Sequence, residues 1–377
     1  MPPSSGKLTE PPTQPSRRVG HLRPRRPTDP LASRKIVCDR YLAFEVGSGR
    51  IARVPNQHIR QQHSLPPLIA VVGPTAIGKT ALGIHLARAF DGEIISADSR
   101  QFYRRMNIGT AKPAREELAQ APHHLIDIAD PDETVGLAQF LRLARQTLQE
   151  ITARGRLPLV VGGTGQYVRA LLEGWQVPEV PPDPELRARL GREAEKDPDA
   201  VWQRLLALDP AVVDFIDPRN VRRVVRALEV SLMTGQPFSA LRRRTPPPYN
   251  ILRIGLTMDR EALYVRADAR VDAMVATGLL DEVKDLLACG YGWELPALSG
   301  LGYAQFRPFF AGQASLDEVV ERIKFDTHDF IRRQYTWFRL NDPAIRWYQA
   351  DDPDLRPHAT EVVGSHLTNP AVDLDSA

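Results

Sequence analysis

The stretch VVGPTAIGKT, which begins at Val71, constrains this chain more than any other part of its sequence. Its GxxxxGKT spacing is the P-loop pattern, in which backbone N–H groups close round a phosphate and the lysine reaches the outer phosphate. The apolar run Leu68–Val72 predicts a strand before the motif, and Ala81–Phe90 predicts an amphipathic helix after it. A phosphate then lies at a helix N-terminus, where free N–H groups and the dipole favour an anion. The motif predicts phosphate binding but does not by itself predict ATP hydrolysis.

From Leu65 onward, short apolar runs alternate with amphipathic stretches, which is typical of an α/β fold with a parallel sheet flanked by helices. The predicted strands are Leu68–Val72, Glu93–Ser96, Leu157–Val161 and Ile251–Thr257. The predicted helices are Ala81–Phe90, Leu137–Ala153 and Tyr167–Leu172. Between 178 and 248 the strand signals vanish, and helical patterns are separated by proline-rich breakers. We therefore predict a P-loop NTPase-like core over 65–177 and 249–345, an all-helical insertion over 178–248, and a disordered tail over 350–377.

The composition limits the class of protein. The 377 residues are 42% hydrophobic and 25% charged, as in a soluble globular protein, and no apolar run approaches the roughly 20 residues that span a bilayer. Cys38 and Cys289 lie far apart and form no CxxC pair. We expect a cytoplasmic, reducing location without a disulfide framework or a zinc site, and a monomer.

The N-terminal segment differs from the rest of the chain in charge. Up to Gln62 there are 12 Lys/Arg against 4 Asp/Glu, a net charge of +8, whereas the remainder carries −5. Six prolines fall within the first 24 residues. Such a segment buries too little apolar surface to fold, so residues 1–64 are predicted to be disordered. A tail that attracts nucleic acid, a transit peptide, a misassigned start and a plain solvated extension all remain open for it.

A carboxylate follows the second predicted strand, at Asp98 in EIISADSRQFY. In that position it can hold Mg²⁺ through water or act as a general base toward a substrate N–H or O–H. Capping of a following helix is the structural alternative. The histidines of APHHLID, His123 and His124, are interpreted as structural or surface residues.

The third predicted strand ends in GGTG, Gly162 to Gly165, where an ordinary P-loop NTPase has a carboxylate for Mg²⁺. Glycines there permit close backbone approach, and Thr164 offers a hydroxyl to a phosphate or a transferring group. A guanine-recognition signature of the Asn-Lys-x-Asp type is missing, which argues against a GTPase.

Seven motifs together resemble the tRNA dimethylallyltransferases, also called tRNA isopentenyltransferases. They are GPTAIGKT, DSRQFYRRMNIGTAKP, APHHLID, LVVGGTGQY, NVRRVVRALEV, LSGLGYAQF and RRQYTWFR. They run in family order from Leu68 to Arg339, roughly 70% of the chain. The first 65 or so residues and the segment beyond Gln349 lie outside the resemblance.

The resemblance implies transfer of a dimethylallyl group from dimethylallyl diphosphate to N6 of the adenosine just 3′ of a tRNA anticodon, in tRNAs that read codons beginning with U. It implies that Asp98 is the general base, that Thr164 steadies the diphosphate, and that Mg²⁺ with Thr80 stabilises the leaving anion. An arginine of the helix REALYVRADARVDAM also contacts the diphosphate, and Arg266 and Arg270 are equal candidates because they lie on one helix face. The implied diphosphate-binding residues are Gly73, Pro74, Thr75, Ala76, Ile77, Gly78, Lys79, Thr80, Arg266 and Arg270.

The resemblance implies that the helical insertion grips the anticodon stem of tRNA, and that tRNA contacts come from four segments and from Arg187. They are Asp98, Ser99, Arg100, Gln101, Arg187, Arg222, Arg223, Val224, Val225, Arg226, Gly302, Tyr303, Gln305, Arg332, Arg333, Gln334, Trp337 and Arg339. A triple-arginine helix face also suits phosphate contact by its chemistry alone. Of the aromatic pair Trp337 and Phe338, at least one is expected to be a core residue.

Two departures from the family pattern are visible. Ile77 stands where many members have serine, and LSGLGYAQF lacks the basic residues that some members carry. No zinc-finger pattern follows the core, which favours the bacterial or organellar type. The rival functions are an adenylate dimethylallyltransferase, a P-loop small-molecule kinase, and an RNA-binding protein without catalysis.

Deleting residues 1–60 is expected to leave transferase activity largely intact, because the motifs begin only at Leu68. The measurement compares tRNA prenylation by the full-length and truncated proteins at equal concentrations. A large loss on truncation would instead identify the basic extension as a working tRNA-binding arm.

Overall fold

The computed structural model describes residues 43–46, 50–53 and 65–368. The chain divides into two compact units, residues 1–62 and 63–377. In the first unit, β1 (Ala43–Val46) pairs antiparallel with β2 (Arg50–Arg53). The prediction of disorder for residues 1–64 falls otherwise outside the described residues, and so does the end of the chain beyond 368.

The second unit is built on one six-stranded sheet in which every neighbouring pair is parallel. Its strand order is β10-β9-β3-β6-β4-β5. The strands are β3 (Pro67–Val72), β4 (Gly92–Ser96), β5 (His123–His124), β6 (Leu157–Gly162), β9 (Asn250–Thr257) and β10 (Arg346–Gln349). The predicted α/β fold class is confirmed. The two outer strands β5 and β10 were not predicted, because they are short and carry no apolar run.

Alternating side chains of the central strand feed two separate cores. Leu68, Ala70 and Val72 belong to one hydrophobic cluster, and Ile69 and Val71 belong to the other. Successive side chains of a strand point to opposite faces, so a strand buried on both faces reads as a continuous apolar run. This explains why LIAVV is recognisable from sequence.

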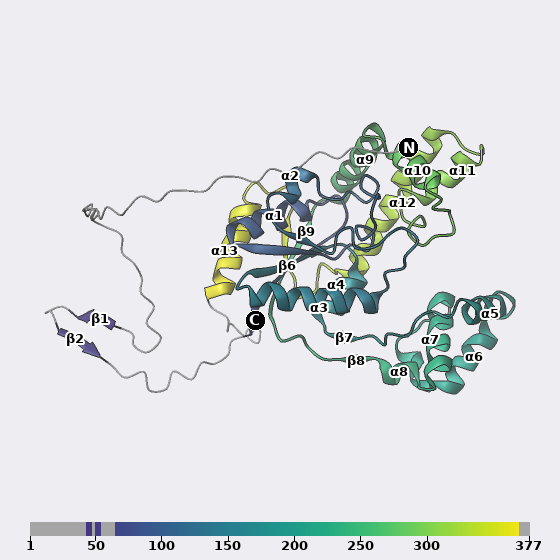
Figure 1. Ribbon diagram of the computed structural model, residues 1–377, viewed down its shortest axis with the longest axis horizontal. Coiled ribbons are helices and arrows are strands. Elements are labelled where there is room, and N and C mark those ends of the chain that lie inside the picture. The colour runs from purple at the N-terminus through teal and green to yellow at the C-terminus, as the bar shows by residue number, and fades with distance from the viewer. Residues whose placement is uncertain (1–42, 47–49, 54–64, 369–377) are drawn as a thin grey trace, which may run out of the picture. The chain divides into compact units, whose positions relative to one another are not determined.

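Helices cover both faces of the sheet (Figure 1). The face fed by Ile69 is covered by α1 (Lys79–Ala89), α9 (Arg260–Ala276) and α13 (Leu355–Thr368). The opposite face is covered by α3 (Leu137–Ala153), α4 (Gly165–Leu172) and α10 (Leu279–Ala288). The long helix α12 (Leu316–Trp337) contributes to both cores. The shorter elements around it are α2 (Arg115–Leu118), the 3₁₀ turn η2 (Ala304–Phe306) and α11 (Arg307–Phe310).

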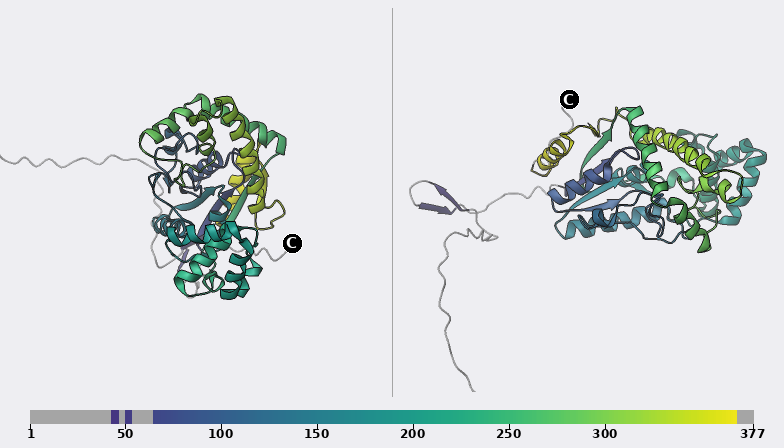
Figure 2. Two further views of the ribbon diagram at one scale, coloured as in Figure 1. Left: turned by 90° about the vertical axis from the view of Figure 1, so that its right-hand side faces the viewer. Right: turned by 90° about the horizontal axis from the view of Figure 1, so that it is seen from above.

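The helical insertion leaves and re-enters the core through a pair of antiparallel strands, β7 (Trp175–Gln176) and β8 (Arg243–Arg244). It contains α5 (Pro184–Lys196), α6 (Pro198–Leu208), η1 (Pro210–Asp214), α7 (Val221–Thr234) and α8 (Phe238–Leu241). These helices pack on a small core of their own. They form the separate teal and green bundle of Figure 1, and the left view of Figure 2 shows it from the side.

Aspartate–proline pairs define the helix starts of the insertion. Asp183 caps α5 and Asp197 caps α6, and each carboxylate accepts a hydrogen bond from a backbone N–H at 2.9 Å. Proline follows each cap because its missing N–H costs nothing in the first helical turn. The prolines read as breakers in the sequence are therefore also starting signals.

The predicted disordered tail over 350–377 is wrong for its first part, because α13 spans Leu355–Thr368. Only Ala359 and Val363 of this helix are buried, so its apolar pattern is too weak to show in the sequence. The helix packs on α1, where His85 Nε2 lies 3.0 Å from Thr360 Oγ1. Among the described residues, no helix has both the length and the apolar character needed to cross a membrane.

Candidate active site

The P-loop connects β3 to α1, as the motif predicts. Gly78 precedes the first residue of α1 with φ +102°, a left-handed conformation that favours glycine. A Cβ on Gly73 would lie 2.6 Å from the carbonyl oxygen of Leu256, so only glycine fits against β9 there. Both motif glycines are thus required by the geometry of the loop.

A cavity of about 520 Å³ lies where β3, β4 and β6 end. Its wall is made by the P-loop, the loops after β4 and β6, and one side each of α9 and α12. Ligands of open parallel sheets bind at these carboxyl ends, and the volume is that of a small-molecule site. The cavity therefore joins the predicted phosphate loop to Asp98 and Thr164, which both line it.

Lys79, the lysine of the P-loop motif, is half-buried, and its Nζ donates a hydrogen bond of 2.6 Å to the carbonyl oxygen of Pro74. Burial lowers the pKa of Lys79 to about 8, while Asp98 opposes this shift and Arg270 adds to it. Burial disfavours the charged form of the lysine, whereas a bound anion favours it. An anion in the cavity would therefore stabilise the ammonium group and gain a strong partner in it.

The arginines on α9 differ in position. Arg270 lines the cavity, and burial lowers its pKa against the attraction of Asp98. Arg266 is exposed one turn earlier, with its Nη2 3.6 Å from the place that a Cβ on Gly78 would occupy. The geometry favours Arg270 as the cavity residue and places Arg266 at the rim of the P-loop.

Asp98 stands at the start of a turn and no helix follows it, which removes the helix-cap alternative. Its Oδ1 accepts a hydrogen bond of 2.9 Å from the backbone N–H of Arg100. Thr164 Oγ1 accepts one of 3.1 Å from the N–H of Ser99, which leaves the hydroxyl proton of Thr164 free to donate. The carboxylate and the hydroxyl are thus held by neighbouring residues of one turn.

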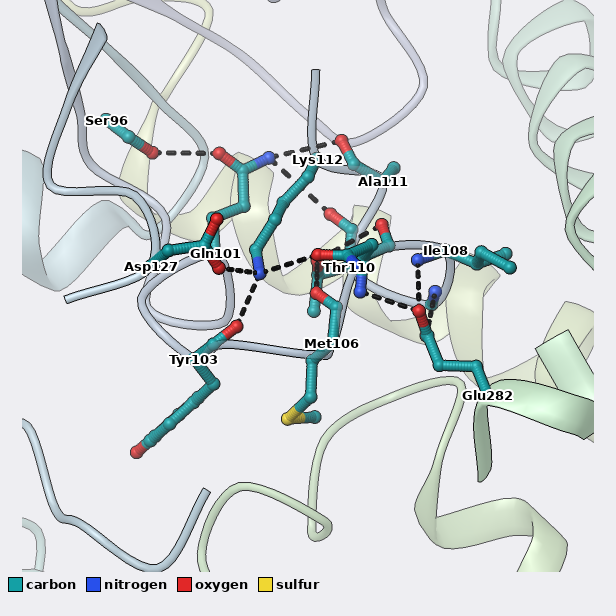
Figure 3. Close-up of polar contacts among 12 residues, drawn as sticks. Ser96, Gln101, Tyr103, Met106, Ile108, Thr110, Ala111, Lys112, Asp127 and Glu282 are labelled. Atoms are coloured by element: carbon teal, nitrogen blue, oxygen red, sulfur yellow. Dashed lines mark hydrogen bonds and ion pairs between the residues drawn. The ribbon is translucent and has the colours of Figure 1, made fainter. Parts of the chain in front are cut away.

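The loop over 101–112 forms a further side of the cavity and is held from two directions (Figure 3). Gln101 Oε1 accepts from Ser96 Oγ at 2.9 Å, and its Nε2 donates to the carbonyl oxygen of Ala111 at 3.2 Å. Lys112 is nearly buried and pairs with Asp127. The oxygen and the nitrogen of the Gln101 side-chain amide are therefore both hydrogen-bonded inside the protein, which does not favour the predicted contact of Gln101 with tRNA.

Glu282 on α10 fixes the outer part of the same loop. Its carboxylate accepts three backbone N–H groups, from Asn107, Ile108 and Gly109, at 2.7, 2.8 and 3.1 Å. It also accepts the hydroxyl of Tyr303 at 2.7 Å. Glu282 is not predicted from the sequence, since a glutamate in an amphipathic helix gives no signal of a partner far away in the chain.

Two predicted tRNA-binding residues of the segment around Tyr303 are engaged inside the protein. Tyr303 is fully buried, and burial raises the pKa of its hydroxyl. Gln305 accepts from the N–H of Gly302 at 3.0 Å and donates to Asp326 at 2.7 Å. Gly302 lines the cavity with φ +90°. Tyr303 supports the loop, and its predicted contact with RNA does not fit its burial.

The arginines of α7 fall into two kinds. Arg222 and Arg223 are exposed, as a phosphate-contacting face requires. Arg226 bonds the fully buried carboxylate of Glu229 at 2.8 Å, and Arg187 of α5 bonds the same carboxylate at 2.8 Å. The side chains of the neighbouring Val224 and Val225 are buried in the insertion core, which does not fit a contact of these side chains with RNA.

The end of α12 is two-sided. Arg332, Arg333 and Arg339 are exposed, and Arg333 also lines the cavity. Phe338 is buried, which confirms that at least one aromatic residue here belongs to the core. Trp337 packs over Gly165, where a Cβ would lie 2.3 Å from the tryptophan side chain.

Gln334, between these residues, is buried and faces the P-loop. It accepts a hydrogen bond of 2.8 Å from the N–H of Thr75 and donates one of 2.9 Å to the carbonyl oxygen of Gly163. Its predicted contact with tRNA does not fit a side chain that is 3% exposed and bonded at both ends.

The loop after β4 and the strand β5 supply structural contacts and one unpaired acceptor nitrogen. Arg100 Nη1 donates to the carbonyl oxygen of Pro296 at 2.7 Å. His124 bonds Glu93 at 2.7 Å, in line with the structural role predicted for it. His123 lines the cavity, and its buried Nε2 has no hydrogen-bond partner among the described residues.

The donor set of the cavity fits Mg²⁺ only in company with a ligand. Thr80 and Asp98 line the cavity, while the described residues contain no cluster of three or more His, Cys, Asp or Glu that could hold a metal by itself. Mg²⁺ commonly takes one or two protein oxygens and completes its shell with water and substrate phosphates.

Known proteins share this combination of fold and motifs. The IPP transferase family model matches residues 101–341, and the isopentenyl transferase model matches 66–130. The chain belongs to the IPP transferase family. The tRNA dimethylallyltransferase of Roseiflexus castenholzii is 56% identical over 298 residues, which cover 79% of this chain and 97% of the relative. That of Chloroflexus aggregans is 56% identical over 290 residues, 77% of this chain and 98% of the relative. The predicted family resemblance is confirmed.

Solved structures agree with these matches. The tRNA isopentenylpyrophosphate transferase of Bacillus halodurans is 38% identical with a TM-score of 0.61, and the match covers 81% of this chain and 97% of that protein. A eukaryotic dimethylallyltransferase described as acting on tRNA is 27% identical with a TM-score of 0.71, over 82% of this chain and 81% of that protein.

Binding of an alkyl diphosphate is expected to take up a proton at about pH 8.5, because the lowered pKa of Lys79 leaves much of it neutral there and the bound anion restores the ammonium form. For the same reason, the affinity for the alkyl diphosphate is expected to fall as the pH rises above about 8 and Lys79 loses its charge. Calorimetric titration in two buffers of different ionisation enthalpy measures the uptake. Lys79→Arg, which stays charged, serves as the control and takes up no proton. Equal enthalpies for the native protein in both buffers would contradict the prediction.

Proposed function

We propose that this protein transfers a dimethylallyl group from dimethylallyl diphosphate to the exocyclic N6 of the adenosine just 3′ of a tRNA anticodon. The products are N6-(dimethylallyl)adenosine in tRNA and diphosphate. The proposal includes action as a monomer in the cytoplasm. It is supported by the family to which the chain belongs and by relatives named tRNA dimethylallyltransferase.

One observation carries the proposal: a single cavity holds a cationic phosphate loop and a carboxylate side by side. Lys79 and Arg270 supply positive charge, and Asp98 interacts electrostatically with both. A phosphate site alone fits many nucleotide-binding proteins. A base beside it fits a reaction in which an anion leaves while a proton is removed from the attacking group.

The proposed chemistry follows the charges. The carbon–oxygen bond of the donor breaks, and its electron pair leaves with the diphosphate, which Lys79 and Arg270 stabilise as negative charge develops. The new bond forms between N6 and the allylic carbon, and Asp98 takes the N6 proton. The free hydroxyl proton of Thr164 is available to a diphosphate oxygen. Mg²⁺, bound with Thr80 and the diphosphate, would add Lewis-acid charge stabilisation.

The acceptor is proposed to reach the cavity from the side of the arginine-bearing elements. Arg333 and Trp337 border the cavity, and exposed Arg222 and Arg223 lie on the insertion. Exposed arginines suit phosphate contacts along an RNA stem, whereas the reacting base must leave its stack to enter. An insertion with its own core suits a polymer substrate better than a free nucleotide.

The deciding experiment offers the protein labelled dimethylallyl diphosphate, Mg²⁺, an unmodified tRNA with adenosine 3′ of the anticodon, and AMP as a competing acceptor. Label is expected in the tRNA, and primer extension or nuclease mapping locates it at the expected adenosine. Label in AMP would favour an adenylate dimethylallyltransferase. ATP consumption without label would favour a kinase, and tRNA binding without either would favour a non-catalytic RNA-binding protein.

Asp98→Asn is expected to lower kcat by about 10²–10⁴-fold, because the amide keeps the size of the side chain and its acceptor for Arg100 but removes the base. Single-turnover rates measure the loss, and filter binding should give an unchanged tRNA Kd. Asp132→Asn, at an exposed position, is the matched control. Near-normal turnover of Asp98→Asn would overturn the base assignment.

A further inference from the structure

Three loops of the cavity are tied together through one buried amide. The P-loop follows β3, the Asp98 turn follows β4, and the Gly163–Thr164 segment follows β6. Gln334 of α12 bonds the first loop at the N–H of Thr75 and the third at the carbonyl oxygen of Gly163. Thr164 then bonds the second at the N–H of Ser99. The three loops thus form one hydrogen-bonded series.

We propose that Gln334 is a positioning residue that sets the spacing between the phosphate loop and the pair Asp98 and Thr164. The inference rests on the proposed transfer reaction. Gln334 lines the cavity, but its 3% exposure and its two hydrogen bonds fit a role inside the protein better than a contact with tRNA.

Glutamine suits this place because it offers both an acceptor and a donor at one distance from the backbone. Its Oε1 must face the N–H of Thr75, and its Nε2 must face the carbonyl of Gly163, so the two partners fix the orientation of the amide. Glutamate offers two acceptors and would face the Gly163 carbonyl with an oxygen. Methionine has a similar length and offers neither bond.

The contact is close as well as polar. A Cβ on Gly163 would lie 2.5 Å from Gln334 Nε2, so the absence of a side chain on Gly163 lets the amide reach its carbonyl. One turn further along α12, Trp337 packs over Gly165 in the same way. Gln334 and Trp337, on one face of α12, therefore pack against Gly163 and Gly165, the residues on either side of Thr164.

The series also decides which P-loop amide is available to a ligand. The N–H of Thr75 is already occupied by Gln334, so it does not contribute to the anion cradle while this bond is intact. The cradle then consists of the later amides of the loop and the N-terminus of α1. Loss of Gln334 would release the N–H of Thr75 and the carbonyl of Gly163 together, and the carbonyl, which is buried, would be left without this partner.

Small displacements of reacting groups lower the rate constant strongly. A misplacement of about 1 Å can cost about 10²-fold. Gln334→Met is therefore expected to lower kcat by about 10–10²-fold while the tRNA Kd changes by less than about twofold. Gln334→Glu keeps the Thr75 bond but not the Gly163 bond, and is expected to be impaired in kcat as well. Gln149→Met, an exposed change on α3, is the matched control.

The test first establishes transfer by the native protein, since absence of transfer there would refute the proposed function and not this inference. Melting curves and active-site titration then correct each variant for its folded fraction. A raised tRNA Kd with native kcat would overturn the inference in favour of an RNA contact. Native kcat per folded molecule in both Gln334 variants would overturn it in favour of a purely structural role.

A double-mutant cycle with Thr164→Val gives a second readout. If Gln334 acts through Thr164, adding Gln334→Met to Thr164→Val should lower kcat much less than it does in the native background. Fully additive losses would contradict action through Thr164.

Discussion

The ends of β4 and β6 approach each other so closely that their backbones are in contact, and the site depends on this approach. A Cβ on Gly162 would lie 2.3 Å from the carbonyl oxygen of Ala97, the residue just before Asp98. Without side chains on Gly162 and its neighbour, the Asp98 turn can lie against the P-loop side of the sheet. A carboxylate at this strand end, as in ordinary P-loop NTPases, would push the two loops apart. The glycines thus make space for the Asp98 turn at the strand end where a nucleotide hydrolase places a metal ligand.

The close packing around the cavity also desolvates its charged side chains, and neighbouring charges offset part of this cost. Desolvation of their charged ends lowers the pKa values of both Lys79 and Arg270, and Asp98 is the carboxylate that favours their charged forms. The described residues that line the free cavity include four cationic side chains, of Lys79, Arg100, Arg270 and Arg333, against the one carboxylate of Asp98. A diphosphate balances this excess, so its departure after reaction restores a less favourable state. The charge arrangement therefore suits a ligand on which negative charge develops.

The features that sequence predicts well are local, and those it misses depend on distant contacts. The P-loop, the strand Leu68–Val72 and the helix Leu137–Ala153 carry their signals in consecutive residues. Gln334 bonds partners 259 and 171 positions away, so nothing near it in the chain indicates its role. Motif matching also transfers whole segments without saying which side chains face outward. That is why Val224, Val225 and Tyr303 were predicted to contact RNA although packing buries them. The edge strands β5 and β10 and the helix α13 lack apolar periodicity, so they are recognised only from their contacts in the three-dimensional structure.

The pair β7 and β8 has a topological consequence. The chain leaves the core at Trp175 and returns at Arg244, and these two residues are cross-strand partners. A Cβ on Gly174 would lie 1.7 Å from the carbonyl oxygen of Thr245, so the two crossing segments are fastened where they meet the core. The whole helical insertion is therefore one long connection between the paired strands β7 and β8. Because the entropy of closing a loop grows only slowly with its length, such a module can be lengthened, shortened or exchanged with little effect on the core. The insertion and the core that holds the cavity can therefore diverge independently within one chain.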